Sequence, residues 1–305
     1  MPDCSQSVRF MKIALIANPH AGGNKGRKLI DPVTRLLAAR DISCDLMVTT
    51  YHQHAWHIAE NLAPENYDGI VCLGGDGTNY QILNGLLKSH SKEAIPPLGI
   101  IPVGRGNSFA RDLNIHSTTD GVAAVAGQRA KPVDVCSFTQ RNELFYFINL
   151  AGFGFVTDAG ITAHRFNYLG IFSYVVGVLL RTMGLSLHHL ELEIDGKLIS
   201  GKNCFVEFCN SRFTGGAMLM APEAKIDDGL LDVVVVGPLS RISLMATFPK
   251  IYTGKHGENP AVSFYQAQNV KVRTAPAKML LPDGEIFGTT PTEINIHPKS
   301  VRYFC

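Results

Sequence analysis

The chain has few charged residues and almost no net charge. Of its 305 residues, 18% are Asp, Glu, Lys or Arg, and the formal net charge is +2 with a pI near 8.1. Domains that bind nucleic acids usually carry a concentrated basic patch and a high pI, whereas the basic residues here are scattered. We therefore expect no nucleic-acid partner and only local contacts with any polyanion.

Paired cysteines and a secretory leader are also missing. The seven cysteines are odd in number and widely spaced, without a C-x-x-C pair. This pattern is typical of reduced cysteine and argues against a structural zinc site. Residues 1–10 are polar and lack the basic and then apolar segments of a signal peptide. Together these absences favour a cytoplasmic location.

No segment is long and apolar enough to predict a membrane span. The longest apolar run, from Tyr168 to Leu180, has thirteen residues, well short of the roughly 20 that are needed. A buried helix is the preferred interpretation of this run, and contact with lipid is the alternative. The apolar fraction of 46% suits sizeable cores, and the length favours two domains.

Apolar and amphipathic stretches alternate regularly in the first part of the chain. This alternation predicts a doubly wound, parallel α/β sheet. The predicted strands are 12–17, 44–48, 67–73 and 98–101, and the predicted helices are 28–39, 55–62, 80–87 and 108–113.

After Pro132 the pattern changes to short β-rich runs separated by turn signals such as Asp195-Gly196, which predict a mainly antiparallel region. Its predicted strands are 145–150, 190–194, 204–209, 231–236 and 270–274, with a helical patch over 166–183. We expect an α/β domain over 1–132 with a leader over 1–10, a second domain over 133–290, and a tail over 291–305.

Three glycine-rich turns, at 18–23, 74–79 and 102–107, each follow a predicted strand and precede a predicted helix. At the carboxyl ends of parallel strands, such turns let backbone N–H groups approach a phosphate. Neither G-x-x-x-x-G-K-[ST] nor G-x-G-x-x-G is present. One such turn can serve chain geometry alone, but three in succession favour an anion or nucleotide site.

Asp76 stands inside the second of these turns. A carboxylate there would repel a polyphosphate unless it meets a cation, a sugar hydroxyl or the attacking hydroxyl. The alternative is an aspartate that only caps a turn or a helix.

The motif Gly74-Gly75-Asp76-Gly77-Thr78 resembles the GGDGT signature of diacylglycerol kinases, sphingosine kinases and bacterial lipid kinases of the YegS-like branch, and more distantly that of NAD kinases and phosphofructokinases. Further matches follow in family order: N-P-x-A-G at 18–22, P-V-G-R-G-N-S-F-A-R-D-L at 102–113, D-D-G-L-L-D at 227–232 and D-G-E at 283–285. The resemblance covers nearly the whole chain. It implies a nucleotide-binding α/β domain, a lipid-binding β-sandwich domain with the active site between them, and a tail that returns to the first domain.

The resemblance also implies a kinase that uses ATP and Mg2+ to phosphorylate a lipid hydroxyl, such as that of diacylglycerol or a sphingoid base. Glu285 is the expected proton acceptor, and Asp76 is a further expected catalytic residue. Asp283 is the second candidate base, or it orients the acceptor or a metal-bound water. Because Asp283 and Glu285 are close in sequence, mutual repulsion is expected to raise the pKa of at least one of them. A solvated turn is the alternative for this segment.

The residues implied to bind nucleotide are Asn18, Thr49, Gly74, Gly75, Asp76, Gly77, Thr78, Asn79, Gly104, Arg105 and Asn107. Thr50 is an equal alternative to Thr49. Asp228, with the carbonyls of Lys225 and Leu230, resembles a structural magnesium site, and an ordinary hairpin turn is its alternative.

Two residues depart from the family pattern. Arg105 replaces the usual threonine and Ser108 replaces the usual aspartate. A guanidinium at position 105 could still reach a phosphate. Nucleotide binding therefore stays expected, and the choice of acceptor stays open.

Other functions compete with the kinase. Ser108 lies in an approximate G-x-S-x-G motif, and a serine hydrolase could use it with His116, His164 and Asp158. That function leaves Asp76 and the D-G-E unexplained. An NAD kinase and a non-catalytic lipid or nucleotide module are further alternatives.

Two remaining features concern partners and metals. The histidines at positions 52, 54 and 57 have no acidic or cysteine partner, so we expect the start of a surface helix rather than a metal site. With so little net charge, membrane contact is expected to be transient and local. A homodimer is possible.

Overall fold

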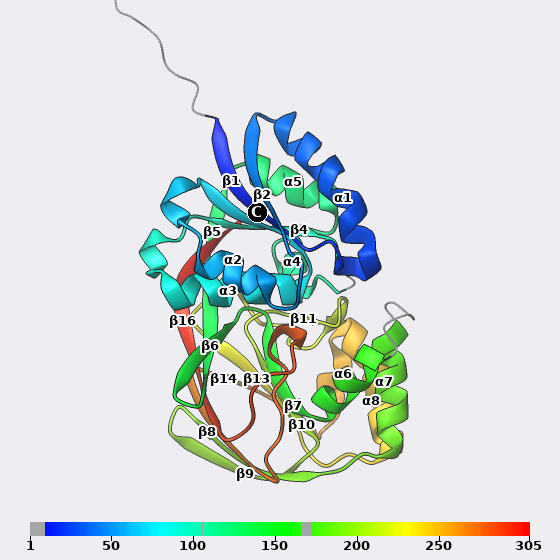
Figure 1. Cartoon of the computed structure of the whole chain (residues 1–305). Helices are drawn as coiled ribbons and strands as arrows, with labels where there is room; N and C mark the ends of the chain where they lie inside the picture. Colours follow the sequence, from blue (N-terminus) through cyan, green and yellow to red (C-terminus); the bar gives the residue numbers. More distant parts are fainter. Residues whose placement is uncertain (1–9, 105, 166–171) are drawn as a thin grey trace, which may run out of the picture.

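Two long strands, β5 (Ala130–Gln140) and β16 (Thr292–Phe304), run side by side through both lobes of the protein (Figure 1). The structure is a computed structural model that describes residues 10–104, 106–165 and 172–305. The two strands are antiparallel, from the pair Ala130 and Phe304 to the pair Phe138 and Ile294, with a shift of register between His297 and Val301. Both belong to one ten-stranded sheet, so the lobes share a sheet.

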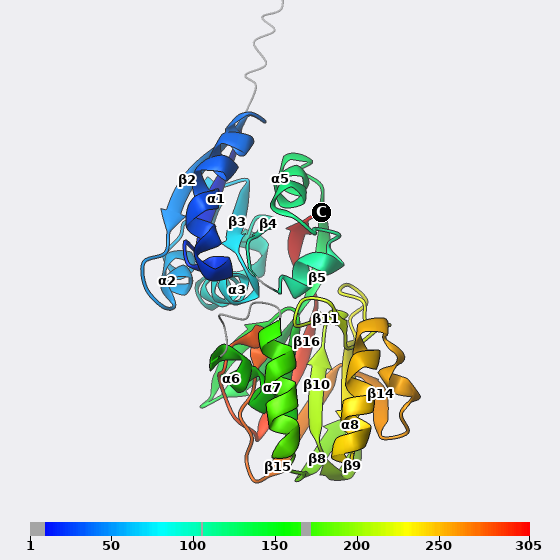
Figure 2. The same ribbon diagram turned by 90° about the vertical axis from the view of Figure 1, so that its right-hand side faces the viewer.

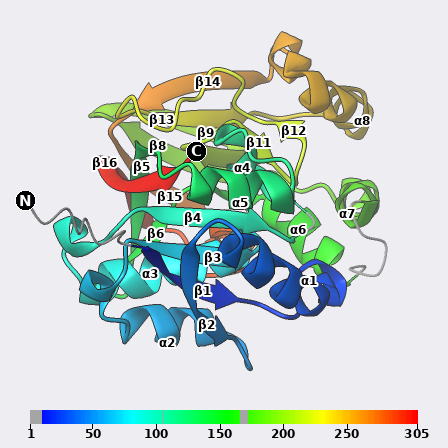
Figure 3. The same cartoon turned by 90° about the horizontal axis from the view of Figure 1, so that it is seen from above.

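The upper lobe in Figure 1 contains a parallel sheet in the order β2-β1-β3-β4, followed by β16. Figure 3 shows α2 and α3 beside each other on one flank of these strands and α1 on the other. The elements are β1 (Met11–Ala17), α1 (Ala21–Ala38), β2 (Ile42–Val48), α2 (His54–Glu60), β3 (Gly69–Gly74), α3 (Asp76–Ser89), β4 (Leu98–Pro102), α4 (Ser108–Asp112) and α5 (Thr118–Ala126), with short 3-10 turns at Pro64–Asn66 and Lys92–Ala94. Strands β3 and β4 are buried throughout, which explains their continuous apolar runs. The predicted mixed α/β fold with a mainly parallel sheet is confirmed.

The helix boundaries differ from the predictions where local turns decide them. Helix α1 starts at Ala21 instead of residue 28, but Gly22, Gly23 and Asn24 have φ values of 63°, 72° and 70°. Its first residues are therefore a left-handed turn that continues into the helix. Helix α5 was not predicted; its N-cap is Ser117, whose hydroxyl accepts the N–H of Asp120 at 3.1 Å.

The lower lobe contains a separate antiparallel sheet in the order β14-β13-β10-β7, as predicted for the C-terminal region. Its strands are β7 (Leu150–Gly154), β10 (Phe205–Cys209), β13 (Leu231–Val236) and β14 (Val262–Ala267). The predicted strand 145–150 is in fact the end of one strand and the start of another. The remaining strands are β6 (Glu143–Phe147), β8 (His188–Ile194), β9 (Lys197–Asn203), β11 (Phe213–Thr214), β12 (Met218–Leu219) and β15 (Asn269–Ala275).

Apolar side chains fill the space between the two sheets of the lower lobe. Phe138 and Phe147 come from the ten-stranded sheet, and Phe153 and Phe208 come from the four-stranded sheet. Each is fully buried. This core makes the lower lobe a β-sandwich.

Three helices cover the outer face of the four-stranded sheet: α6 (Phe155–Arg165), α7 (Phe172–Met183) and α8 (Arg241–Thr247) (Figure 2). Helix α7 forms most of the predicted patch 166–183, whose first six residues lie outside the described ones. Short 3-10 turns follow α8 at Phe248–Thr253 and Lys255–Glu258. Within the described residues, no helix is both long and apolar enough to cross a bilayer.

The predicted domain boundaries fall at definite places in this fold. Pro132 lies inside β5, and the predicted tail contains the whole of β16. Tyr303 of β16 pairs with Leu98 of β4 in the upper lobe. Division of the chain at these points stays a prediction.

Asp134 ties the crossing strands to the loop before β13. It is 0% exposed, and its carboxylate accepts N–H groups from Lys299 and Gly229, both at 2.6 Å. Asp134→Ala leaves both donors without an acceptor and should lower the free energy of unfolding by about 3 kcal/mol. Urea denaturation measures this loss. The exposed neighbour Asp227 supplies the control, because Asp227→Ala should stay within about 0.5 kcal/mol of the original.

Candidate active site

The three glycine turns meet at the carboxyl ends of β1, β3 and β4. The N–H of Val103 donates to the carbonyl of Gly74 at 2.8 Å, and the N–H of Asn18 donates to that of Leu73 at 3.0 Å. A Cβ on Gly75 would lie 3.1 Å from the Cα of Gly104, and a Cβ on Gly104 would lie 2.8 Å from the Cα of Gly75. Only glycines permit this approach, so the turns form one continuous backbone surface.

Side chains from the same turns hold this surface together. The amide of Asn18 donates to the hydroxyl of Thr78 at 3.0 Å, and that of Asn107 donates to the carbonyl of Gly104 at 2.8 Å. Asn79 is buried and accepts the hydroxyl of Tyr303 at 3.1 Å. These predicted nucleotide residues therefore lie together.

The other predicted nucleotide residues have different surroundings. Thr49 follows β2 at the same edge of the sheet, is buried, and donates its N–H to Ala17 at 2.9 Å. Thr50 is exposed, and its hydroxyl lies 3.1 Å from Nδ1 of His54. Arg105 lies outside the described residues.

Asp76 begins α3, but its carboxylate caps another helix. It accepts the N–H of Ser108 at 3.0 Å and that of Phe109 at 3.3 Å, at the start of α4. Burial raises the pKa of Asp76, although these hydrogen bonds favour its charged form. The carboxylate thus joins the second glycine turn to the third.

Asp283 is buried and is held by three backbone donors. The N–H groups of Asn149 and Leu150 donate to Oδ1 at 2.9 and 3.1 Å, and that of Ile148 donates to Oδ2 at 3.0 Å. Burial is the main cause that raises the pKa of Asp283 to about 7, and the charge of Asp76 adds to it. Proximity to Glu285 was the predicted cause, but the structure assigns the increase to burial.

Glu285 brings the D-G-E turn onto the GGDGT turn. A methyl group on Gly77 would collide with Oε1 of Glu285, so the carboxylate lies directly over this glycine. Glu285 is partly exposed. Burial and the charges of Asp283 and Glu285 raise the pKa of Tyr80, a residue of α3. The three predicted catalytic acids therefore gather at the contact between the lobes.

Helix α4 also makes contacts with the lower lobe that the sequence did not reveal. The carboxylate of Asp112 accepts Nε of Arg212 at 2.6 Å and the N–H of Arg212 at 3.0 Å. The hydroxyl of Ser108 accepts the N–H of Gly216 at 3.0 Å. The Gly215-Gly216 pair was the one feature of the sequence that could have indicated this contact. Its position next to α4 is determined by the fold.

The hydrolase residues are not assembled around Ser108. Its side chain is buried, and in the described part of the chain no hydrogen bond joins it to His116 or Asp158. His116 is exposed and donates its N–H to Asp120 at 3.0 Å. The side chain of His164 lies outside the described residues.

The predicted metal loop contains two exposed acids, Asp227 and Asp228. Oδ1 of Asp228 accepts the N–H of Leu230 at 3.0 Å, which closes a turn. Carboxylate and carbonyl oxygens, such as that of Lys225, suit Mg2+. Among the described residues, no three His, Cys, Asp or Glu side chains cluster as a metal site. The magnesium site stays a prediction.

The histidines near the start of α2 bind neighbouring groups instead. His54 stacks on Tyr51, with ring centroids 4.2 Å apart, and its Nδ1 accepts the N–H of Thr50 at 3.0 Å. The Tyr51 hydroxyl lies 3.1 Å from Nδ1 of His57. These contacts fit the expected start of a surface helix.

Comparison with known proteins finds two matching family domains. Residues 12–138 match the diacylglycerol kinase catalytic domain, and residues 150–305 match the YegS C-terminal NAD kinase beta sandwich-like domain. The diacylglycerol kinase of Bacillus subtilis (strain 168) is 27% identical over 288 residues, which cover 93% of each chain. Sphingosine kinase 1 of Arabidopsis thaliana is 24% identical over 308 residues, which cover 85% of this chain and 64% of that protein.

The fold is also similar to a solved structure. A crystal structure of a candidate diacylglycerol kinase from Bacillus anthracis str. Sterne superimposes with a TM-score of 0.80 and 26% identity over 97% of both chains. These matches confirm the resemblance that the motifs predicted. They favour a kinase over the serine hydrolase.

Asp283 and Glu285 should differ in what they do for stability. Asp283→Asn places an amide against backbone donors and should lower the free energy of unfolding by about 2–3 kcal/mol. Because the pKa of Asp283 rises from 3.8 to about 7 on folding, the unmodified protein should lose stability as pH rises from about 4 to about 7. Asp283→Asn should flatten this pH dependence, measured by denaturation at several pH values.

Glu285→Gln is the matched control, because the side chain is partly exposed. Its stability should remain within about 0.5 kcal/mol of the original protein. Equal losses in both variants would contradict the assignment of Asp283 as the structural acid.

Proposed function

Because the chain belongs to the family of lipid kinases with a diacylglycerol kinase catalytic domain and a YegS-type C-terminal domain, we propose that it transfers the γ-phosphate of ATP, with Mg2+, to a lipid hydroxyl. The observation that carries this proposal is the position of Glu285 directly over Gly77. A proton acceptor from one lobe thereby faces the predicted phosphate-binding turn of the other.

Backbone donors would bind the phosphates. Helix α3 begins at Asp76, and the first N–H groups of a helix have no partner within it. The N–H groups of Asp76, Gly77 and Thr78 therefore suit phosphate oxygens, and the helix dipole adds to the attraction. Because the Asp76 carboxylate binds the N–H groups of α4, its charge is partly compensated, which reduces repulsion of an anion.

Glu285 would accept the proton of the lipid hydroxyl as the hydroxyl oxygen bonds to the γ-phosphorus, whose bond to the β,γ-bridging oxygen breaks to release ADP. Phosphoryl transfer depends mainly on positioning and charge neutralisation, and bound Mg2+ supplies the latter. The carboxylate oxygens of Asp76 suit a hard cation at the phosphates, and Asp228 with the carbonyls of Lys225 and Leu230 would hold a structural Mg2+. Asp283 fixes the turn on which Glu285 lies.

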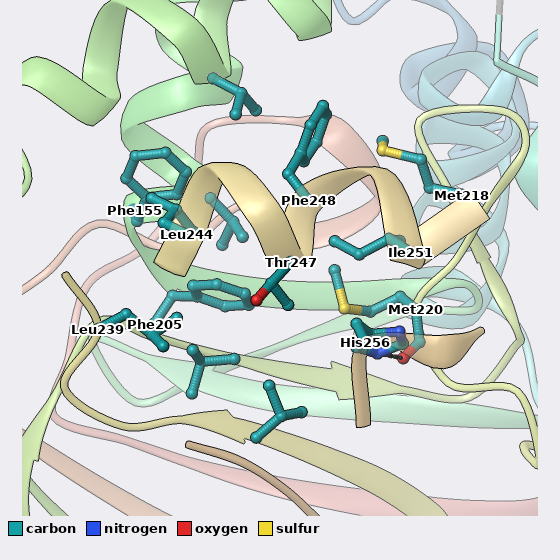
Figure 4. A pocket seen from close by; sticks show the side chains of 14 residues that line it. Phe155, Phe205, Met218, Met220, Leu239, Leu244, Thr247, Phe248, Ile251 and His256 are labelled. Carbon is teal, nitrogen blue, oxygen red and sulfur yellow. Dashed lines mark hydrogen bonds between the residues drawn. The ribbon is translucent and has the colours of Figure 1, made fainter. Parts of the chain in front are cut away.

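An apolar cavity in the lower lobe suits a hydrocarbon chain (Figure 4). It lies between the outer face of the four-stranded sheet and helices α6, α7 and α8, and Phe155, Val178, Phe205 and Leu244 are among its lining residues. Its volume is about 30 Å³, so a chain can enter only if the helices move outward. We assign the lipid tail to this cavity.

The same helices carry exposed apolar side chains. Leu179, Leu180 and Met183 lie on α7, and Ile242, which is 83% exposed, lies on α8. These four residues form the apolar rim. Helices α7 and α8 contact each other and line the cavity, so the rim lies next to the proposed lipid site. We propose that the rim touches the membrane surface transiently, from the cytoplasm, to collect the lipid.

Removal of the proposed base should abolish phosphoryl transfer. Glu285→Gln keeps the shape of the side chain but cannot accept a proton at neutral pH, so kcat should fall by about 10² to 10⁴-fold. Labelled ATP with diacylglycerol, sphingosine, monoacylglycerol and phosphatidylglycerol as acceptors measures the activity. Asp76→Ala should also be strongly impaired.

The exposed residue Glu65 provides a control, since Glu65→Gln should retain full activity. Full activity of Glu285→Gln and Asp76→Ala would refute this mechanism. If Mg-ATP binds but no lipid is phosphorylated, the non-catalytic module gains support. Addition of NAD to the same panel of acceptors tests the alternative function of an NAD kinase.

A charge on the apolar rim should weaken membrane binding. Ile242→Asp should reduce cosedimentation with anionic vesicles by roughly tenfold, because the carboxylate resists transfer into the interface and is repelled by anionic lipid. Leu198 is 67% exposed and lies on β9, the edge strand of the ten-stranded sheet, and not on the helices that carry the rim, so Leu198→Asp is the control. Equal binding of both variants would place the membrane contact elsewhere.

A further inference from the structure

Glu207 is a buried acid in the middle of the four-stranded sheet. It is 2% exposed, and its Oε2 has no hydrogen-bond partner within the described chain. Burial alone raises the pKa of Glu207 to about 8. An acid in this state destabilises a folded protein, and a leucine of similar size would suit the site better. This cost points to a functional reason for the glutamate.

The strand register places Glu207 on the helix-covered face of the sheet. Along β10, Phe205 and Cys209 point to the same face as Glu207 because side chains alternate. Phe205 lines the apolar cavity, and both Phe205 and Cys209 belong to the core beneath the helices. Glu207 therefore faces α6 to α8 and not the space between the two sheets.

Glu207 lies between the catalytic acids and the apolar cavity. Leu150, whose N–H binds Asp283, pairs with Cys209, two residues from Glu207 and about 7 Å along the strand. In the other direction Phe205, a wall of the cavity, is also two residues away. If a lipid places its hydroxyl at Glu285 and its tail in the cavity, the segment that joins the hydroxyl to the tail would pass Glu207.

The side chains of Glu207 and Val156 fill the space over a glycine of the neighbouring strand. Gly152 of β7 pairs with Glu207, and a Cβ there would lie 2.9 Å from both Cγ of Glu207 and Cγ2 of Val156. Val156 lines the cavity. The side chain of Glu207 thus lies next to Val156, a wall of the cavity, without a side chain of residue 152 between them.

We propose that Glu207 determines acceptor specificity: its carboxyl group receives a hydrogen-bond donor that the lipid carries between its reacting hydroxyl and its hydrocarbon chain. This inference rests on the proposed lipid kinase function. It favours a sphingoid base, whose ammonium group lies next to the reacting hydroxyl, over diacylglycerol, whose other hydroxyls are esterified. A monoacylglycerol offers a hydroxyl as a weaker, uncharged donor.

The test compares Glu207→Leu and Glu207→Gln with the unmodified enzyme, using sphingosine, monoacylglycerol and diacylglycerol in mixed micelles. The unmodified enzyme should prefer sphingosine. Glu207→Leu should lower the ratio of kcat/KM for sphingosine to that for diacylglycerol at least about tenfold. Glu207→Gln should lower it less, because its carbonyl oxygen still accepts a hydrogen bond. Both variants should keep their activity on diacylglycerol and melt at an equal or higher temperature than the original protein.

An unchanged ratio in Glu207→Leu, with lipid kinase activity present, would overturn the inference and leave the proposed function intact. A similar loss on all three lipids would assign Glu207 a structural role and overturn it equally. Equilibrium binding of a fluorescent sphingosine provides a readout independent of catalysis. If the unmodified protein binds it and Glu207→Leu does not, recognition of the lipid by Glu207 is supported. Absence of phosphorylation of every lipid would then refute the kinase proposal and not this recognition.

Discussion

The contact between one carboxylate and three successive backbone N–H groups determines the geometry of the whole site. Asp283 binds residues 148 to 150, where β6 ends and β7 begins. The segment before it follows β7, since the N–H of Leu281 donates to Gly152 at 2.9 Å. Displacement of this segment would leave buried donors without acceptors, which costs more than an exposed loop can recover. Glu285 is therefore held over Gly77 by the backbone of the lower lobe.

The acids at the contact between the lobes divide into two kinds. Asp76 and Asp283 bind backbone N–H groups and connect elements that are distant in sequence. For Glu285 the described structure contains no side-chain hydrogen bond, although the side chain lies at the GGDGT turn. A proton acceptor has to exchange partners during a reaction, and a carboxylate that holds the backbone cannot do so without loss of structure. Among the described residues, Glu285, the proposed proton acceptor, is thus the acid that has no backbone to hold.

Local patterns predicted the parts of the site, and long-range contacts determined the details. The alternating apolar runs located the parallel strands, and the resemblance carried by the motifs placed Asp76 and the D-G-E turn in one predicted active site. The sequence also suggested that Asp76 caps a helix. The helix that it caps begins 32 residues later, at Ser108, and no rule of sequence spacing predicts that partner. The partners of Ser108 and Asp112, at positions 216 and 212, depend on how the lobes pack. The sequence does not show that Glu207 is buried, so only the structure reveals that its Oε2 has no hydrogen-bond partner within the described chain.

Strand β16 has a consequence for how the protein is made. It pairs with β4, β5 and β15, so it completes a sheet whose first strand begins at Met11. On the ribosome, β4 and β5 emerge roughly 150 residues or more before this partner and must wait with unpaired edges. The upper lobe therefore cannot finish folding independently as it is synthesised, and the glycine turns that it carries gain their final support only after the lower lobe has been translated.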